Sequence, residues 1–113
     1  MVDTLHLHDE AFPLDQDGFL LDPARWSPEL AHQIARTLVG IELEEAHWPV
    51  LELLRELYFN YDLAPANRQL VKVVRERLGE DKGSSIYLMT LFGGSPAKDA
   101  ARIAGLPKPP HCL

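Results

Sequence analysis

The segment Glu44-Glu-Ala-His-Trp-Pro-Val-Leu-Glu-Leu-Leu-Arg-Glu-Leu-Tyr-Phe-Asn-Tyr61 is the longest helix-forming stretch of the chain and indicates its fold class. Two acidic residues open it, and Pro49 is compatible with a helix only within the first turn. Apolar residues then recur at helical spacing and form one stripe, made of Trp48, Leu51, Leu54, Tyr58 and Tyr61. The segment therefore predicts an amphipathic helix that packs against a core.

Shorter helices are predicted on both sides of this segment. Ser27 followed by Pro28 is typical of a helix start, and Gly40 of a helix end. Pro65 is suited to the first turn of the next helix, and Gly93-Gly94 separates the last two. The predicted helices cover residues 27–40, 44–61, 65–78, 84–92 and 95–104.

The N-terminal residues carry a different pattern. Residues 4–8 alternate apolar and polar side chains, as a half-buried strand does. Phe12, Leu14 and Gly18-Phe-Leu-Leu21 supply partner strands across short acidic turns. We therefore expect a small β-hairpin before a mainly α-helical chain.

Composition limits the class of protein. A chain of 113 residues fits one domain, and it contains no run of about 18 apolar residues that would span a membrane. The start, Met1-Val-Asp-Thr-Leu-His6, is neither basic nor apolar enough for a signal peptide. With a single cysteine, these features predict a cytoplasmic protein that makes no membrane contact.

Charge is distributed unevenly along the chain. Residues 1–62 hold 13 acidic and 3 basic side chains, whereas residues 63–113 hold 4 acidic and 8 basic ones. A positive field near the C-terminus would favour a thiolate there and attract an acidic partner or a phosphate. Solvated helix faces explain the same distribution equally well.

Cys112 is the only cysteine and the next-to-last residue. It has no partner for a disulfide within its own chain. It is either an accessible thiol for another protein or an ordinary residue near a chain end, where sequence is least constrained. His111 and Lys108 would raise its thiolate fraction once the tail docks on a partner.

Other residues offer weaker chemistry. His6 and His8 form an H-x-H pair, but no third ligand lies at a useful spacing, so surface histidines are the better interpretation. We predict neither a metal nor a cofactor. The helices on both sides of Asp62–Ala64 are compatible with a helix-turn-helix, although an exposed basic helix face is the more common cause of such a pattern.

Four C-terminal motifs are more specific: Lys82-Gly-Ser-Ser-Ile-Tyr-Leu88, Leu91-Phe92, Pro96-Ala-Lys98, and Ile103-Ala-Gly-Leu-Pro-Lys-Pro109 shortly before Cys112. Together they resemble the TusE/DsrC family of sulfur-relay proteins. The resemblance covers nearly the whole chain and includes Gly18-Phe-Leu20, Trp26, Gly40-Ile41, His47-Trp48, Leu54-Arg55, Pro65, Arg68 and Leu70-Val71. The chain departs from the family pattern at Gly93, Ser95 and His111.

The resemblance implies a fold and a division of the chain. The fold is a mainly α, orthogonal helical bundle with a small N-terminal β-hairpin and a winged-helix-like arrangement. Residues 1–104 would form the helical sulfur-carrier domain. Residues 105–113 would form a flexible C-terminal arm that bears the active Cys112.

The resemblance also implies a function, that of a sulfurtransferase carrying a persulfide on Cys112. Relatives of the DsrC type have a second cysteine eleven positions earlier, where this chain has Ala101. The single thiol is similar to the TusE type, which accepts sulfur from the TusBCD complex and passes it, with the thiouridylase MnmA, to the tRNA wobble uridine. Candidate docking or activating residues are Arg68, Lys98, Arg102, Lys108 and His111.

Two alternatives stay open. The first is a DsrC-like sulfur carrier for a dissimilatory sulfur-oxidation or sulfite-reductase-linked pathway, with the same chemistry and another client. The second is a winged-helix module that binds nucleic acid through Arg68, Lys72 and Arg75.

Overall fold

The N-terminal hairpin pairs β1 (Thr4–Leu7) with β2 (Glu10–Pro13) in the computed structural model, which describes residues 3–110. The strands are antiparallel, with Leu5 opposite Phe12, and both of these side chains are buried. An isolated bridge between Leu14 and Leu20 extends the pairing. The predicted hairpin is confirmed. The partner strand expected at residues 18–21 does not form, because only Leu20 makes a bridge there and Leu21 is 61 % exposed.

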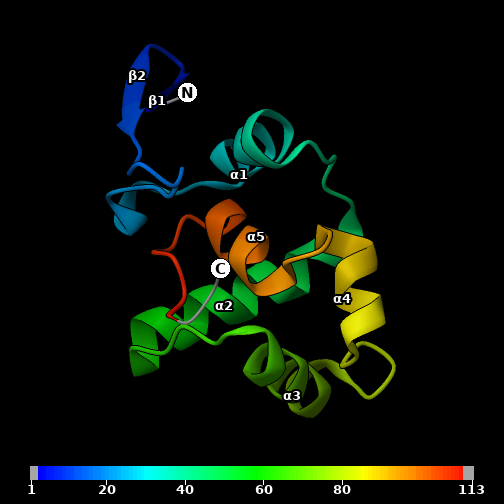
Figure 1. Cartoon of the computed structure of the whole chain (residues 1–113). Coiled ribbons are helices and arrows are strands. Elements are labelled where there is room, and N and C mark those ends of the chain that lie inside the picture. The colour runs from blue at the N-terminus through cyan, green and yellow to red at the C-terminus, as the bar shows by residue number, and fades with distance from the viewer. Residues whose placement is uncertain (1–2, 111–113) are drawn as a thin grey trace.

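Helices make up most of the remaining chain (Figure 1). Two short 3₁₀ turns, Pro23–Arg25 and Glu45–His47, precede α1 and α2, and a π-helical turn, Ala35–Val39, continues α1. The α-helices are α1 (Pro28–Ile34), α2 (Trp48–Tyr61), α3 (Asn67–Leu78), α4 (Ser85–Phe92) and α5 (Pro96–Ile103). The predicted class, a mainly helical bundle with an N-terminal hairpin, is confirmed.

Two predicted helix starts are confirmed by their caps. The Ser27 hydroxyl accepts a hydrogen bond from the Leu30 N–H at 3.1 Å, and the Ser84 hydroxyl accepts one from the Tyr87 N–H at 3.1 Å. Each bond satisfies an N–H that the helix itself leaves without a partner.

Two other starts were predicted too early. The segment from Glu44 begins as a 3₁₀ turn, and α2 starts only at Trp48, which places Pro49 in its first turn. Pro65 lies in the extended connection before α3. There the side-chain oxygen of Gln69 accepts the Ala66 N–H at 3.3 Å, which fixes the start of α3 at Asn67.

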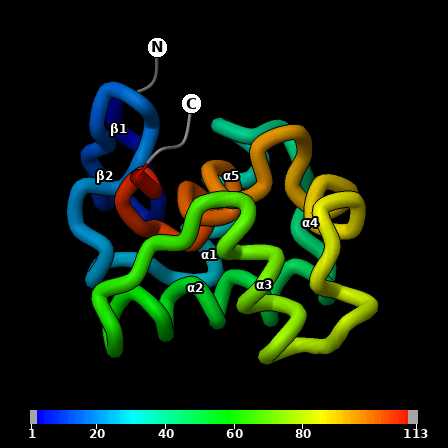
Figure 2. The backbone as a smooth tube through the Cα atoms, turned by 60° about the horizontal axis from the view of Figure 1, so that its bottom comes forward, coloured from blue at the N-terminus to red at the C-terminus, as the bar shows by residue number. Residues whose placement is uncertain are grey.

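The α5 helix lies at the centre of the bundle and contacts the other four α-helices (Figures 1 and 2). Its buried face consists largely of small residues, which let neighbouring backbones approach closely: Ala97, Ala100, Ala101 and Ile103. Tyr61 was predicted to belong to the apolar stripe, but its side chain is 62 % exposed. It is the last residue of α2 and extends past the edge of the core.

His47 is a buried polar residue that joins the start of α2 to the end of α4. Its Nδ1 accepts the Glu44 N–H at 2.9 Å, so Nε2 carries the proton and donates to the Leu91 carbonyl at 2.8 Å. The ring also packs edge-on against Phe92. Its role is therefore structural.

Replacing His47 with phenylalanine should lower the free energy of unfolding by about 2 kcal/mol, because two part-buried hydrogen bonds to backbone groups are lost while the volume stays filled. Urea denaturation measures the loss. The matched control is His6→Phe on the exposed side of β1, which should change stability little. Equal losses in the two variants would contradict the structural role.

Candidate functional site

The described part of the C-terminal arm, residues 105–110, packs against the helical body. The Leu106 N–H donates to the Ala101 carbonyl at 3.0 Å, and the Leu106 side chain is only 4 % exposed. Pro109 is buried as well. The arm leads from the end of α5 toward the C-terminal end of α2 (Figure 1). Its predicted flexibility remains a prediction, and His111 and Cys112 lie outside the described residues.

The root of the arm is held by two side chains from other elements. The Trp26 indole N–H donates to the Ile103 carbonyl at 2.9 Å. The Arg55 guanidinium donates to the Ala104 carbonyl at 2.8 Å and to the Pro23 carbonyl at 3.1 Å. The bonds to Ile103 and Ala104 satisfy carbonyls that the last turn of α5 leaves without partners. We call Trp26 and Arg55 the arm clamp.

Aromatic rings enclose the Arg55 guanidinium. Its central carbon lies 4.3 Å from the ring centroid of Trp26 and 4.9 Å from that of Phe59. Both distances are within the range of cation–π attraction. Burial between the rings lowers the pKa of Arg55 below its ordinary value, yet an arginine keeps its charge at any physiological pH.

Gly105 is the residue at which the chain turns out of α5. Its φ is +71°, in the region that glycine adopts at little cost. A Cβ atom at this position would lie 2.4 Å from Cδ1 of Trp26. The turn and the close approach of the indole both require glycine.

Arg102 and Lys108, two predicted docking residues, both reach Asp17. Arg102 donates to the Asp17 carbonyl at 2.9 Å and to the Asp99 carboxylate at 2.8 Å, and it stacks on Phe19. The Lys108 ammonium lies 3.8 Å from the Asp17 carboxylate. Burial raises the pKa of Asp99 above its usual value, against the opposing attraction of nearby cations. In this arrangement the two residues tie the arm and α5 to the N-terminal segment.

Arg68 and Lys98 lie at other places. Arg68 is exposed on α3, and Lys98 is half-buried in the first turn of α5. The structure does not gather Arg68 with the residues that hold the arm, and its docking role remains a prediction.

The alternative nucleic-acid surface on α3 includes Arg75, whose guanidinium donates twice to the Gly83 carbonyl, at 2.9 and 3.2 Å. It thereby holds the loop between α3 and α4. Arg68 and Lys72 remain exposed on the same helix.

A pocket of about 440 Å³ lies at the far end of the arm. Pro110, the last described residue, lines it together with residues from the end of α2, the following connection and α3: Leu57, Asp62, Leu63, Ala64, Pro65, Gln69 and Val73. Its lining is mostly apolar, and Leu63 is 53 % exposed. Cys112 follows Pro110 by two residues in the sequence and lies outside the described residues.

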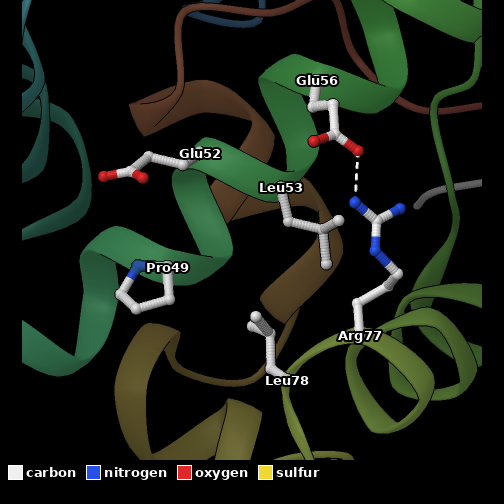
Figure 3. Close-up of a pocket in the computed structure, with 6 residues that line it drawn as sticks. All are labelled: Pro49, Glu52, Leu53, Glu56, Arg77 and Leu78. Atoms are coloured by element: carbon white, nitrogen blue, oxygen red, sulfur yellow. Dashed lines mark hydrogen bonds and ion pairs between the residues drawn. The ribbon is translucent and has the colours of Figure 1, made fainter.

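A second pocket, of about 230 Å³, lies between α2 and α3 (Figure 3). The Glu56 carboxylate and the Arg77 guanidinium form an ion pair across it, and Glu56 raises the pKa of Arg77. Its other lining residues are Pro49, Glu52, Leu53 and Leu78. This lining contains no thiol, hydroxyl or imidazole.

Residues of the types that bind metal ions are dispersed in the structure. Within the described residues 3–110, no three His, Cys, Asp or Glu side chains lie close enough together to hold a metal ion. His8 is hydrogen-bonded to Glu29 of α1. None of the helices within this range is long and apolar enough to cross a membrane.

The sequence pattern did not assign a role to Arg55, Trp26 or the pocket near Pro110. Arg55 contacts a carbonyl 49 residues later, and Trp26 one 77 residues later. The available signal was the resemblance, since Trp26 and Leu54-Arg55 belong to its upstream motifs.

Comparison with known proteins identifies relatives over nearly the whole chain. The profile of the family described as "DsrC like protein" matches residues 6–113. The "Sulfurtransferase TusE homolog" of Haemophilus influenzae is 50 % identical over 99 residues, covering 88 % of this chain and 90 % of the relative. The sulfurtransferase TusE of Sodalis glossinidius is 50 % identical over the same length, covering 88 % and 91 %.

Solved structures agree with these relatives. DsrC of Allochromatium vinosum superimposes with a TM-score of 0.89 at 43 % identity, and each chain is covered completely. The oxidized gamma-subunit of the dissimilatory sulfite reductase (DsrC) from Archaeoglobus fulgidus gives a TM-score of 0.82 at 38 % identity, with 97 % of this chain and 99 % of that chain covered. From its sequence, its relatives and its fold, the chain belongs to the DsrC-like protein family.

Proposed function

We propose that this protein is a TusE-like sulfurtransferase that carries sulfur as a persulfide on Cys112 and passes it toward 2-thiouridine at the tRNA wobble position. The observation that carries the proposal is the lone thiol two residues beyond the described arm, in a chain half identical to sulfurtransferases named TusE. Those relatives are named for sulfur transfer, and a persulfide is the form in which a cysteine can hold one sulfur atom reversibly.

The transfer step exchanges one S–S bond for another. The Cys112 thiolate attacks the terminal sulfur of a donor persulfide, R–S–SH, and forms a new S–S bond. The donor S–S bond breaks, and the donor leaves as the thiolate R–S⁻ with the bonding electron pair. Cys112 then carries –S–SH, and no net oxidation takes place. Attack on that terminal sulfur by an acceptor thiolate repeats the step and restores the Cys112 thiolate.

Ala101 favours a one-thiol cycle. It stands at the position where, by the resemblance, DsrC-type proteins have a second cysteine, and it is a buried residue of α5 that is 3 % exposed. Without a second thiol in the chain, Cys112 cannot resolve its own persulfide into an internal disulfide. The sulfur therefore has to go to another molecule.

The partners follow from this chemistry as part of the proposal. The donor would be a persulfide-bearing complex that resembles TusBCD, and the acceptor a thiouridylase that resembles MnmA with its tRNA. A DsrC-like carrier for a dissimilatory pathway is the second candidate, since DsrC structures superimpose closely on this chain. The two candidates share the chemistry at Cys112 and differ in the acceptor.

Mass spectrometry tests the chemistry and the client separately. After incubation with glutathione persulfide, the intact protein should gain about 32 Da, the mass of one sulfur atom, and lose it again on treatment with a thiol. Deleting the gene should remove 2-thiouridine from digested tRNA, and the native gene should restore it. A protein that never gains the mass refutes the carrier. Unchanged 2-thiouridine refutes the tRNA client and favours the dissimilatory one.

A further inference from the structure

We propose that Arg55, assisted by Trp26, is a positioning residue for sulfur transfer, because it fixes the direction in which the arm leaves α5 and thus where Cys112 meets a partner protein. The proposal rests on the proposed function and adds to it. It assigns no contact between the arm clamp and the sulfur itself.

The arm clamp joins three parts of the chain that are far apart in sequence. One Arg55 guanidinium, from the middle of α2, binds the carbonyl of Ala104 at the root of the arm and that of Pro23 before α1. Trp26 binds the preceding carbonyl, that of Ile103. Two successive carbonyls and the Cα of Gly105 are therefore held against groups of the body.

The chemistry of Arg55 suits orientation better than charge pairing. Its hydrogen-bond acceptors are two backbone carbonyls, and its planar faces lie against Trp26 and Phe59. A planar fork with fixed donor directions holds two carbonyls in one geometry, which the single ammonium of a lysine does not reproduce. Arg55 therefore restricts angles as well as distances at the root.

The direction set at the root also determines the path of the following residues of the arm. Leu106 and Pro109 are buried, and Pro110 lines the pocket of about 440 Å³ at the far end of the arm. Prolines at 107, 109 and 110 fix φ at three positions, which restricts the conformations open to this segment. A change at the root thus moves the end of the arm. Misplacement by about 1 Å can lower a reaction rate about a hundredfold.

The test uses Arg55→Lys and Trp26→Phe, with Arg75→Lys as the matched control. Arg75 also donates twice to a backbone carbonyl, that of Gly83, but it holds the α3–α4 loop. The first two variants weaken the arm clamp and keep similar side chains in place, and the control loses comparable bonds elsewhere. Loss of stability alone would therefore affect the control in the same way.

Three measurements are made on the full-length proteins. Uptake of sulfur from glutathione persulfide should stay within about twofold in all variants, because a small donor needs no fixed direction. Hydrogen exchange at the Leu106 amide should become at least about tenfold faster in Arg55→Lys and Trp26→Phe only. Transfer from the loaded protein to the MnmA-like thiouridylase of the same genome should fall about ten- to a hundredfold in kcat/KM, again in these two only.

The outcomes separate this proposal from the proposed function. If Arg55→Lys passes sulfur to the thiouridylase as well as Arg75→Lys does, the positioning role is overturned. If the Leu106 amide exchanges at the native rate in both arm-clamp variants, it is overturned too. If the native protein takes up no sulfur from glutathione persulfide, the carrier function fails, and the Leu106 exchange still decides whether Arg55 fixes the arm.

Discussion

Cys112→Ser is expected to take up less than about 1 % of the sulfur that the native protein takes up from a persulfide donor. Only a thiolate attacks the terminal sulfur and forms the new S–S bond, and a serine hydroxyl stays protonated at neutral pH. The chain contains no other cysteine that could replace it. Intact-mass measurement after a timed incubation quantifies the loss, and thermal unfolding should show an unchanged fold.

A relocated thiol is the matched control for position. The double variant Cys112→Ser, Lys72→Cys keeps one thiol but places it on the exposed face of α3. It should gain about 32 Da from glutathione persulfide, because any accessible thiolate can react with a small donor. It should not restore 2-thiouridine in cells that lack the native gene. If Cys112→Ser alone gains the mass, or if the relocated thiol restores the nucleoside, the terminal cysteine is not the carrier site.

The helices were predictable because their signals are local. Ser27 and Ser84 accept N–H groups only three residues away, so a cap and an apolar repeat suffice to indicate a helix. The errors arose where two local rules compete. Pro65 is suited both to a first helical turn and to an extended connection, and the Gln69 side chain, which bonds to Ala66, favours the later start.

Cys112 could also be proposed as the carrier site from the sequence alone, since a single cysteine and a specific motif need no coordinates, and that role stays a prediction. The arm clamp could not be predicted in this way. Arg55 appears on a helix as one charged residue beside apolar ones, and such an arginine is usually exposed to solvent. Its hydrogen-bond acceptors are the backbone carbonyls of Ala104 and Pro23, and only the folded bundle brings these two segments together. No residue pattern indicates which backbone carbonyl will accept a hydrogen bond from a distant side chain.

The substitution Gly105→Ala should lower the free energy of unfolding by about 3 kcal/mol. Part of the loss, about 1 kcal/mol, comes from placing an alanine at a φ of +71°. The larger part, about 2 kcal/mol, comes from a Cβ that would lie 2.4 Å from Cδ1 and 3.0 Å from Cβ of Trp26. The indole cannot withdraw freely, because its N–H is bonded to the Ile103 carbonyl.

Gly40→Ala separates the two contributions. Gly40 has a φ of +84°, but a Cβ there would meet nothing within 4 Å, so this variant carries the conformational cost alone. Urea denaturation of both variants should therefore show a loss for Gly105→Ala about 2 kcal/mol greater than for Gly40→Ala. Faster hydrogen exchange at Leu106 should accompany it in Gly105→Ala only, because a displaced Trp26 loosens the root of the arm. Equal losses with native exchange at Leu106 would show that the indole does not confine this turn.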